Sequence, residues 1–235
     1  VENVTEYLEF TGTTRAIEEI EIRARVEGFL ESVHFEDGDY VEEGQLLFMI
    51  DPRPFKAAVE NARGRLAKHK AQLERATKEY ERNLLLFKQN AASEANVVKW
   101  KGEMDESKGT VLSSQGALDK ALLDLSYCTI RAPNDGRVSR KKVDIGNLVG
   151  AGEFTLLTTI RKQDPIYAYF SINERDLLAV MKRAREEGVT AENPDKIPLE
   201  LGLANETGFP HKGHLDFVDS TLDPGTGTML LRGLF

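Results

Sequence analysis

The sequence Arg23-Ala-Arg-Val-Glu-Gly28 recurs loosely as Arg131-Ala-Pro-Asn-Asp-Gly136, a shift of 108 positions (131 minus 23). Glycines repeat at the same shift in three pairs: Gly28 and Gly136, Gly38 and Gly146, Gly44 and Gly152. Glycine is favoured where a chain turns with positive φ or where two backbones approach closely. We therefore expect all six glycines to be structural turns and the two halves to share one turn scheme.

The residues that lead to Gly28 alternate between apolar and charged side chains. Ile20, Ile22, Ala24 and Val26 would lie on one face of an extended chain, with charged residues between them on the other face. This alternation is typical of a half-buried strand. Two halves of this kind, residues 17–52 and 126–160, predict one small β-sandwich.

The segment between the halves, residues 53–125, has an apolar residue at every seventh position, which is typical of a coiled-coil seam. The first series is Val59, Leu66, Leu73, Tyr80 and Phe87, and the second is Val97, Met104, Val111, Leu118 and Leu125. His69 is a polar exception, which we expect to be tolerated in the seam and not to bind a metal. Ser93 can cap the second helix after a short turn, so the two helices must be antiparallel. Each arm of about 35 residues would reach roughly 50 Å.

The remaining residues, 161–235, change pattern. Short alternating stretches predict strands, and a capping box at Ser171-Ile-Asn-Glu174 predicts the start of one helix. With a first strand from residues 1–16, around Tyr7 to Phe10, they predict a small β-barrel. The predicted fold class is therefore α+β: an elongated chain with a coiled-coil α-hairpin inserted in a split sandwich, followed by a barrel with one helix.

Several motifs resemble a known family. Gly38-Asp-Tyr-Val41 and Gly44-Gln-Leu-Leu47 resemble the biotinyl/lipoyl half-motif, and two such halves around a helical hairpin are similar to the membrane fusion protein (periplasmic adaptor) family. Asp164-Pro-Ile-Tyr-Ala-Tyr-Phe170 resembles the β-barrel domain of its resistance-nodulation-division branch. The resemblance implies a lipoyl-like sandwich in a subunit of a tripartite efflux pump. Because the family continues with further barrel strands and a membrane-proximal domain, we expect this chain to be truncated, with its signal or anchor outside it.

The predicted hairpin tip carries Arg82, Leu86 and Ser93, at spacings of four and seven. These residues resemble the Arg-x3-Leu-x6-Ser signature of adaptors that dock onto outer-membrane channels of the TolC type. Arg82 offers a fixed fork of donors, Leu86 an apolar contact, and Ser93 a helix cap with a polar contact. The resemblance implies three partners: an inner-membrane transporter of the resistance-nodulation-division type, a TolC-like channel, and other copies of the chain in a hexameric ring.

The charge of the chain bears on its partners. The formal net charge is −8, from 31 Lys and Arg against 39 Asp and Glu, which argues against binding to nucleic acid. The first half of the sandwich is acidic and includes Glu36 and Asp37, whereas the second half carries Arg140, Lys141 and Lys142. Two interpretations stay open: both halves are solvated faces, or the acidic half of one subunit pairs with the basic half of the next.

Motifs for catalysis are missing from the sequence. It contains no P-loop, no GxGxxG after a strand, no GxSxG and no HExxH. The tight turn that holds a lipoyl-lysine in carrier domains is replaced by the long insertion. His211 and His214 lack further ligands at suitable spacing, and Cys128 suits a packed core position. We predict no catalytic residue, no cofactor and no metal site.

The favoured function is a periplasmic adaptor at the inner membrane, for export of drugs or other small molecules, and not an enzyme. Two alternatives stay open. One is an adaptor of an ATP-driven or type-I secretion exporter. The other is a biotinyl or lipoyl carrier domain of an enzyme, which would require a modified lysine.

Overall fold

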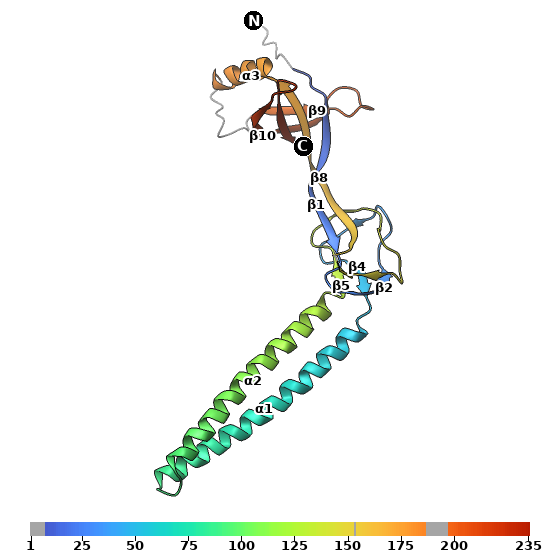
Figure 1. Ribbon diagram of the computed structural model, residues 1–235. Coiled ribbons are helices and arrows are strands. Elements are labelled where there is room, and N and C mark those ends of the chain that lie inside the picture. Colours follow the sequence, from blue (N-terminus) through green and yellow to red (C-terminus); the bar gives the residue numbers. More distant parts are fainter. Residues whose placement is uncertain (1–7, 153, 187–196) are drawn as a thin grey trace.

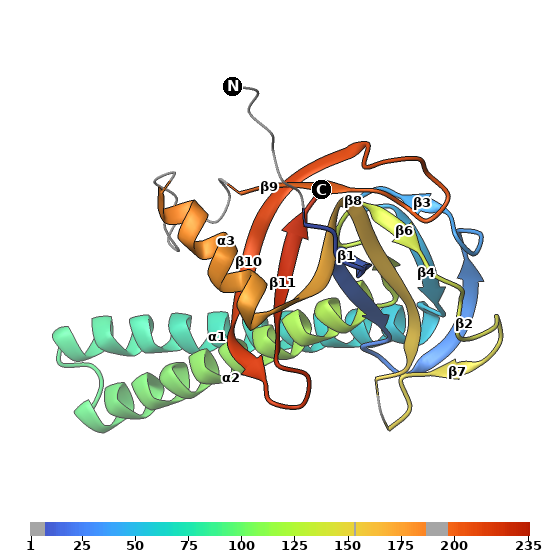
Figure 2. The same cartoon turned by 90° about the horizontal axis from the view of Figure 1, so that it is seen from above.

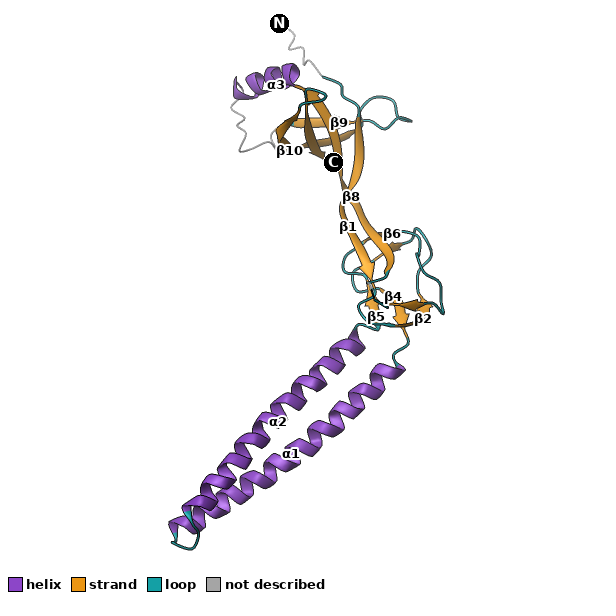
Figure 3. Cartoon of the chain, viewed as in Figure 1, coloured by secondary structure: helices purple, strands orange, loops and turns teal. Residues whose placement is uncertain are grey.

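The computed structural model describes residues 8–152, 154–186 and 197–235, and it has three parts in a line (Figure 1). A two-helix hairpin lies at one end, a β-sandwich in the middle and a half-barrel at the other end. In the described ranges, helices occur in the hairpin and in one short helix on the half-barrel (Figure 3). This arrangement confirms the predicted α+β fold class.

The hairpin consists of α1 (Arg53–Lys88) and α2 (Glu94–Ser126). Pro54 lies at the start of α1, where its missing N–H would have no helical partner. The apolar faces of the two helices pack together, and their buried cluster contains Val59, Leu66 and Leu118. The predicted seam is wrong for Phe87, which is 40% exposed. Phe87 lies in the last turn of α1, where the chain turns away and the packing between the helices ends.

One polar contact crosses the seam of the hairpin. His69 Nδ1 contacts Ser114 Oγ, and the Ser114 hydroxyl donates to the carbonyl of Thr110 at 2.9 Å. Because that hydroxyl has only one hydrogen, His69 Nδ1–H must be the donor toward Ser114. Ser114 is buried, so the contact satisfies a polar group between the helices.

The sandwich has a four-stranded sheet in the order β5-β4-β2-β7. A second layer is formed by β3, β6 and the near ends of two long strands. Apolar residues from both halves of the repeat meet between the layers, with Phe48, Leu30 and Ile160 completely or almost completely buried. The short strands are β2 (Gly28–Val33), β3 (Tyr40–Val41), β4 (Leu46–Ile50), β5 (Thr129–Arg131), β6 (Gly136–Val138) and β7 (Leu148–Val149).

Two long strands connect the sandwich to the half-barrel (Figure 1). They are β1 (Gly12–Arg23) and β8 (Leu156–Asn173), which pair antiparallel along their length. The register shifts between Ala16 and Glu18, at the join between the two parts, and again between Ile22 and Arg23. The boundaries that we expected at residues 16 and 160 therefore fall inside continuous strands.

The half-barrel continues from β8 through β11 (Thr228–Leu234) and β10 (His211–Asp223) to β9 (Pro198–Leu201). Helix α3 (Glu174–Glu186) lies beside β10 in the view from above (Figure 2). The core of this part contains Leu177 of α3 packed with Ile172, Leu215 and Leu231.

Two predictions about the ends of elements are wrong. The first strand begins at Gly12 instead of around Tyr7 to Phe10. Tyr7 lies outside the described residues, and Phe10 stacks on Phe170. Helix α3 is capped by Asn173 instead of Ser171: Asn173 Oδ1 accepts the backbone N–H of Asp176 at 2.8 Å. The reason is that β8 continues past Ser171, held by pairing with β11.

The six repeated glycines divide into two kinds. Gly38, Gly44, Gly146 and Gly152 have positive φ and form turns, as predicted. The prediction is wrong for Gly28 and Gly136, which begin strands β2 and β6. A Cβ atom at Gly136 would lie 2.8 Å from the carbonyl oxygen of Arg161, and one at Gly28 would lie 2.6 Å from Ile50 Cγ2. At these two positions glycine permits a close approach to the neighbouring strand of the same sheet, β8 for Gly136 and β4 for Gly28.

Candidate functional site

The hairpin tip is a defined turn. Helix α1 ends at Lys88, and Asn90, two residues further along the chain, has the left-handed conformation (φ 59°). The Asn90 N–H donates to the carbonyl of Phe87 at 2.9 Å, and the Ala91 N–H donates to the carbonyl of Leu86 at 2.8 Å. These two bonds form a Schellman motif, which satisfies the last carbonyls of the helix. The tip therefore has a fixed backbone shape.

Ser93 caps the second helix, as the sequence predicts. Its backbone is extended (φ −83°, ψ 151°), and its Oγ accepts the N–H of Asn96 at 3.4 Å. Its side chain is exposed, so it can also meet a partner. Ser93 thus starts α2 within five residues of the end of α1 at Lys88.

Arg82 lies on the last turns of α1. Its guanidinium forms an ion pair with Glu79 one turn earlier, with Nη1 and Oε1 3.0 Å apart. The side chain of Arg82 is still 65% exposed. The pair with Glu79 holds the guanidinium near the helix and leaves further N–H donors accessible to another protein.

Leu86 differs from what we expected of an apolar contact. It is half-buried, while its neighbours Leu85 and Phe87 are 58% and 40% exposed. The sequence carries a signal for this, because Leu84, Leu85, Leu86 and Phe87 are consecutive and a helix with 3.6 residues per turn cannot bury all four on one side. The exposed apolar surface near the tip therefore comes from Leu85 and Phe87 of α1 and from Val98 of α2, which is 64% exposed.

The acidic and basic segments of the sandwich meet within one chain. Asp37 Oδ1 accepts the backbone N–H of Lys141 at 2.9 Å, and Lys141 Nζ pairs with Asp144 Oδ1 at 3.0 Å. Glu36, Arg140 and Lys142 are exposed and enter no ion pair among the described residues. Pairing of these segments between subunits stays a prediction.

Two ionisable groups near the base of the hairpin have shifted pKa values. Hydrogen bonds from the Arg53 side chain and backbone lower the pKa of Asp51 to about 2. Burial raises the pKa of the Cys128 thiol to about 11, with a smaller contribution from the charges of Asp51 and Asp124. An ionised Asp51 and a protonated Cys128 at neutral pH suit structural roles.

Groups for catalysis or metal binding do not gather in the described ranges. No set of three or more His, Cys, Asp or Glu side chains there could hold a metal ion. His211 instead pairs with Glu206, with Nε2 and Oε1 3.0 Å apart. The backbone N–H of Leu203 and the His211 ring both lower the pKa of Glu206.

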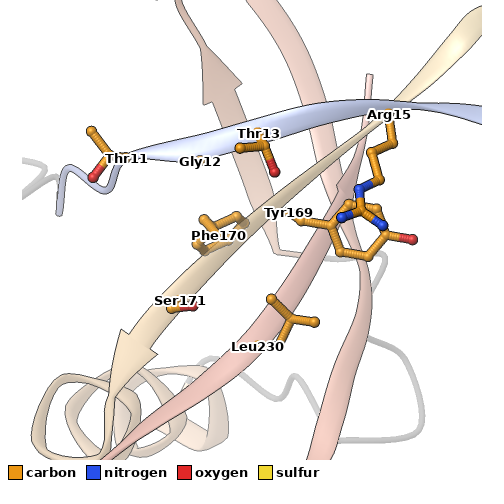
Figure 4. Close-up of a pocket in the computed structure, with 8 residues that line it drawn as sticks. All are labelled: Thr11, Gly12, Thr13, Arg15, Tyr169, Phe170, Ser171 and Leu230. Carbon is orange, nitrogen blue, oxygen red and sulfur yellow. The ribbon is translucent and has the colours of Figure 1, made fainter. Parts of the chain in front are cut away.

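A hollow of about 420 Å³ lies on the half-barrel, between β1, β8 and β11 (Figure 4). Arg15 lies over the ring of Tyr169, with the guanidinium carbon 5.5 Å from the ring centre. None of the lining side chains is a carboxylate, a histidine or a cysteine that could act as a general base. The lining residues are Thr11, Gly12, Thr13, Arg15, Tyr169, Phe170, Ser171 and Leu230.

None of the described helices combines the length and the apolar character that crossing a membrane requires.

Two family models together match most of the chain. The model of the RND MFP barrel-sandwich hybrid domain matches residues 18–161, and the model of the RND MFP β-barrel domain matches residues 165–235. The chain belongs to the RND membrane fusion protein family. The first model covers the split sandwich with its hairpin, and the second covers the half-barrel of this membrane fusion protein.

Similar proteins agree with this assignment. The chain is 34% identical over 234 residues to multidrug resistance protein MdtA of Erwinia amylovora, which covers 100% of this chain and 56% of the relative. It is 33% identical over 232 residues to MdtA of Yersinia enterocolitica, which covers 99% of this chain and 52% of the relative. The chain therefore spans about half the length of the curated relatives it matches.

A solved structure shares the fold of this membrane fusion protein. It is the membrane fusion protein Spr0693 from Streptococcus pneumoniae R6, with a TM-score of 0.65 and 16% sequence identity. The match covers 94% of this chain and 90% of that one.

Proposed function

We propose that this membrane fusion protein is a periplasmic adaptor that links an inner-membrane transporter of the resistance-nodulation-division type to a TolC-like outer-membrane channel. Its relatives carry the name multidrug resistance protein, which supports export of drugs or other small molecules as the task of the assembly. The adaptor is anchored at the inner membrane and acts by binding, not by catalysis.

The hairpin tip is the observation that carries this proposal. A 36-residue helix and a 33-residue helix extend the tip roughly 50 Å away from the sandwich. The Schellman turn and the Ser93 cap fix the backbone there, and Arg82 keeps most of its side chain exposed. An arm of this length with a preformed end suits contact with a distant partner.

The tip binds the channel through complementary groups. The guanidinium of Arg82 donates to carbonyl or carboxylate oxygens of the channel, and Ser93 adds a polar contact. Leu86 supports the turn through its backbone carbonyl, while Leu85 and Phe87 supply apolar surface. Several adaptors surround the pump axis as a hexameric ring, so each contact is repeated around the channel.

Exchange of Arg82 for aspartate tests the proposal. Arg82→Asp removes an exposed ion pair and places a carboxylate three residues from Glu79, so the free energy of unfolding should fall by no more than about 1 kcal/mol. Drug export should nevertheless be lost, because a carboxylate replaces the donors at the docking surface. The measurements are the melting temperature and drug resistance of cells that carry the full-length variant as their only copy.

Arg75→Asp is the matched control, since Arg75 is an exposed arginine of the same helix further from the tip. It makes the same charge change and should leave export nearly intact. A folded Arg82→Asp variant with full export would instead identify the hairpin as a structural coiled coil. Co-purification of an ATP-driven transporter would favour the alternative exporter class.

A further inference from the structure

A row of charged residues crosses the second layer of the sandwich. In the strand register, Tyr40 of β3 lies opposite Arg137 of β6, and Arg137 lies opposite Arg161 of β8. Arg161 in turn lies next to Glu19 of β1 and pairs with it at 2.7 Å. Like charges directly opposite each other in a sheet destabilise it. A negatively charged group near Arg137 and Arg161 would therefore reduce the repulsion between the two guanidinium groups.

Arg137 lacks such a group in the part of the chain that the structure describes. Its Nε donates to the backbone carbonyl of Gly38 at 2.7 Å, which satisfies one donor but does not neutralise the charge. Arg137 forms no ion pair with a described carboxylate, and neither does the nearby Lys162. Arg137 is thus left without a counter-charge, and Lys162 forms no ion pair although Glu18 lies opposite it in the strand register.

These cations line a hollow of about 320 Å³. The hollow contains three cationic side chains and one carboxylate, that of Asp164. Tyr40 stands at its edge with 69% of the residue exposed. The full lining is Gly38, Tyr40, Gly136, Arg137, Arg161, Lys162, Gln163 and Asp164. The hollow has the size and the charge to receive an acidic side chain, with an aromatic ring beside it.

The same chain exposes carboxylates that lack cationic partners. Glu27, Glu31, Glu42 and Glu43 are exposed residues of the acidic half of the sandwich, and none forms an ion pair among the described residues. Lys141, by contrast, is already paired with Asp144 in its own chain. The cations available for a neighbour are therefore those of the hollow rather than Lys141.

We infer that the hollow between Arg137, Arg161 and Lys162 receives a glutamate carboxylate from the acidic half of a second copy of this chain. A guanidinium presents two parallel donors to a carboxylate, which fixes its orientation as well as its charge. Each chain then offers a cationic hollow and an acidic surface, two different patches, and head-to-tail contacts of this kind can close into a ring. This contact rests on the ring assembly of the proposed function and identifies the side chains that form it.

Disulfide trapping between two tagged full-length copies in the membrane tests the inference. One copy carries Gln163→Cys at the rim of the hollow, and the other carries cysteine at position 27, 31, 42 or 43. Because each copy has one new cysteine, the two new thiols can only join different chains. Cys128 can stay, since it is completely buried. At least one acidic position should form a disulfide with position 163.

Charge reversal then distinguishes binding of a glutamate in the hollow from non-specific electrostatic attraction between the two copies. Arg137→Glu in the Gln163→Cys copy should lower the disulfide yield roughly fivefold, the upper range for an exposed ion pair. Arg25→Glu, with the same charge change on an exposed arginine of the same sandwich that lines neither the hollow nor the basic segment, should leave the yield unchanged. If loss of the Gly38 bond unfolds Arg137→Glu, Lys162→Glu replaces it, because the Lys162 side chain makes no described hydrogen bond.

Several results would overturn the inference. These are no disulfide from any of the four positions, equal yields with Arg137→Glu (or its replacement) and Arg25→Glu, or capture of the transporter without a second copy. Each leaves the Arg82 experiment unaffected, so failure of this contact and failure of the adaptor function can be told apart.

Discussion

Cys128 is a residue whose chemistry is set by its surroundings. It is completely buried in the sandwich core, and burial raises the pKa of its thiol from 9.0 to about 11. A thiol needs its ionised form to react with thiol reagents. Between pH 7 and 9 the folded protein therefore keeps Cys128 protonated, buried and inert.

We expect a thiol-reactive dye at pH 8 to leave Cys128 unlabelled in the folded protein and to label it fully in denaturant. The raised pKa also predicts that the contribution of this thiol to stability is complete below pH 9 and decreases as the pH rises from 9 toward 11. Fast labelling of the folded protein, at the rate measured in denaturant, would contradict the buried position.

The sequence predicts some residues of the candidate site better than others. Ser93 could be predicted because a cap depends on a few neighbouring residues. The exposure of Leu85 and Phe87 instead of Leu86 depends on how α1 is rotated about its axis against α2. The heptad series does not determine this rotation at the C-terminal end of α1. The contact of Asp37 with Lys141 spans 104 positions, and charge alone could not place it within one chain.

At the scale of elements, periodicity predicts the helices well. The series from Val59 and from Val97 locates both helices, because a seam must repeat with the period of the coiled coil. The roles of Gly28 and Gly136 could not be predicted, since a strand start in close packing and a turn both favour glycine. The long span of β1 and β8 escaped prediction because one strand pair serves two parts of the fold.

The His69–Ser114 contact is an element-scale feature that can be measured. Ser114→Ala removes the acceptor between the helices, and we expect the free energy of unfolding to fall by about 1 kcal/mol. The double variant His69→Leu with Ser114→Ala replaces both polar groups by apolar ones and should recover most of that loss. Denaturant unfolding of the unsubstituted chain, Ser114→Ala, His69→Leu and the double variant gives the coupling energy.

Thr110→Ala at the edge of the same contact is a useful comparison, because the backbone carbonyl that accepts from Ser114 is kept. Its effect should be smaller than that of Ser114→Ala. Strictly additive effects of the His69 and Ser114 changes would mean that the two side chains do not stabilise each other.

At the scale of the whole molecule, the three parts lie in a line (Figure 1). A compact chain of 235 residues would have a radius of gyration of about 18 Å. Because the hairpin alone extends roughly 50 Å, we expect small-angle scattering of residues 1–235 to give a clearly larger radius and a long tail of interatomic distances. A radius near 18 Å would contradict the extended arrangement.

The paired strands β1 and β8 also determine how the molecule carries a mechanical load. The chain passes from the half-barrel to the sandwich along β1 and returns along β8, so a pull on the hairpin stretches both strands in the same direction. The load is then shared by two covalent backbones, and the hydrogen bonds between them are not sheared. A ribbon of two strands bends readily out of its plane, however, and the register shift beside Glu18 interrupts its ladder of hydrogen bonds between the two parts. The join is therefore a tether that resists lengthening and a hinge that permits tilting.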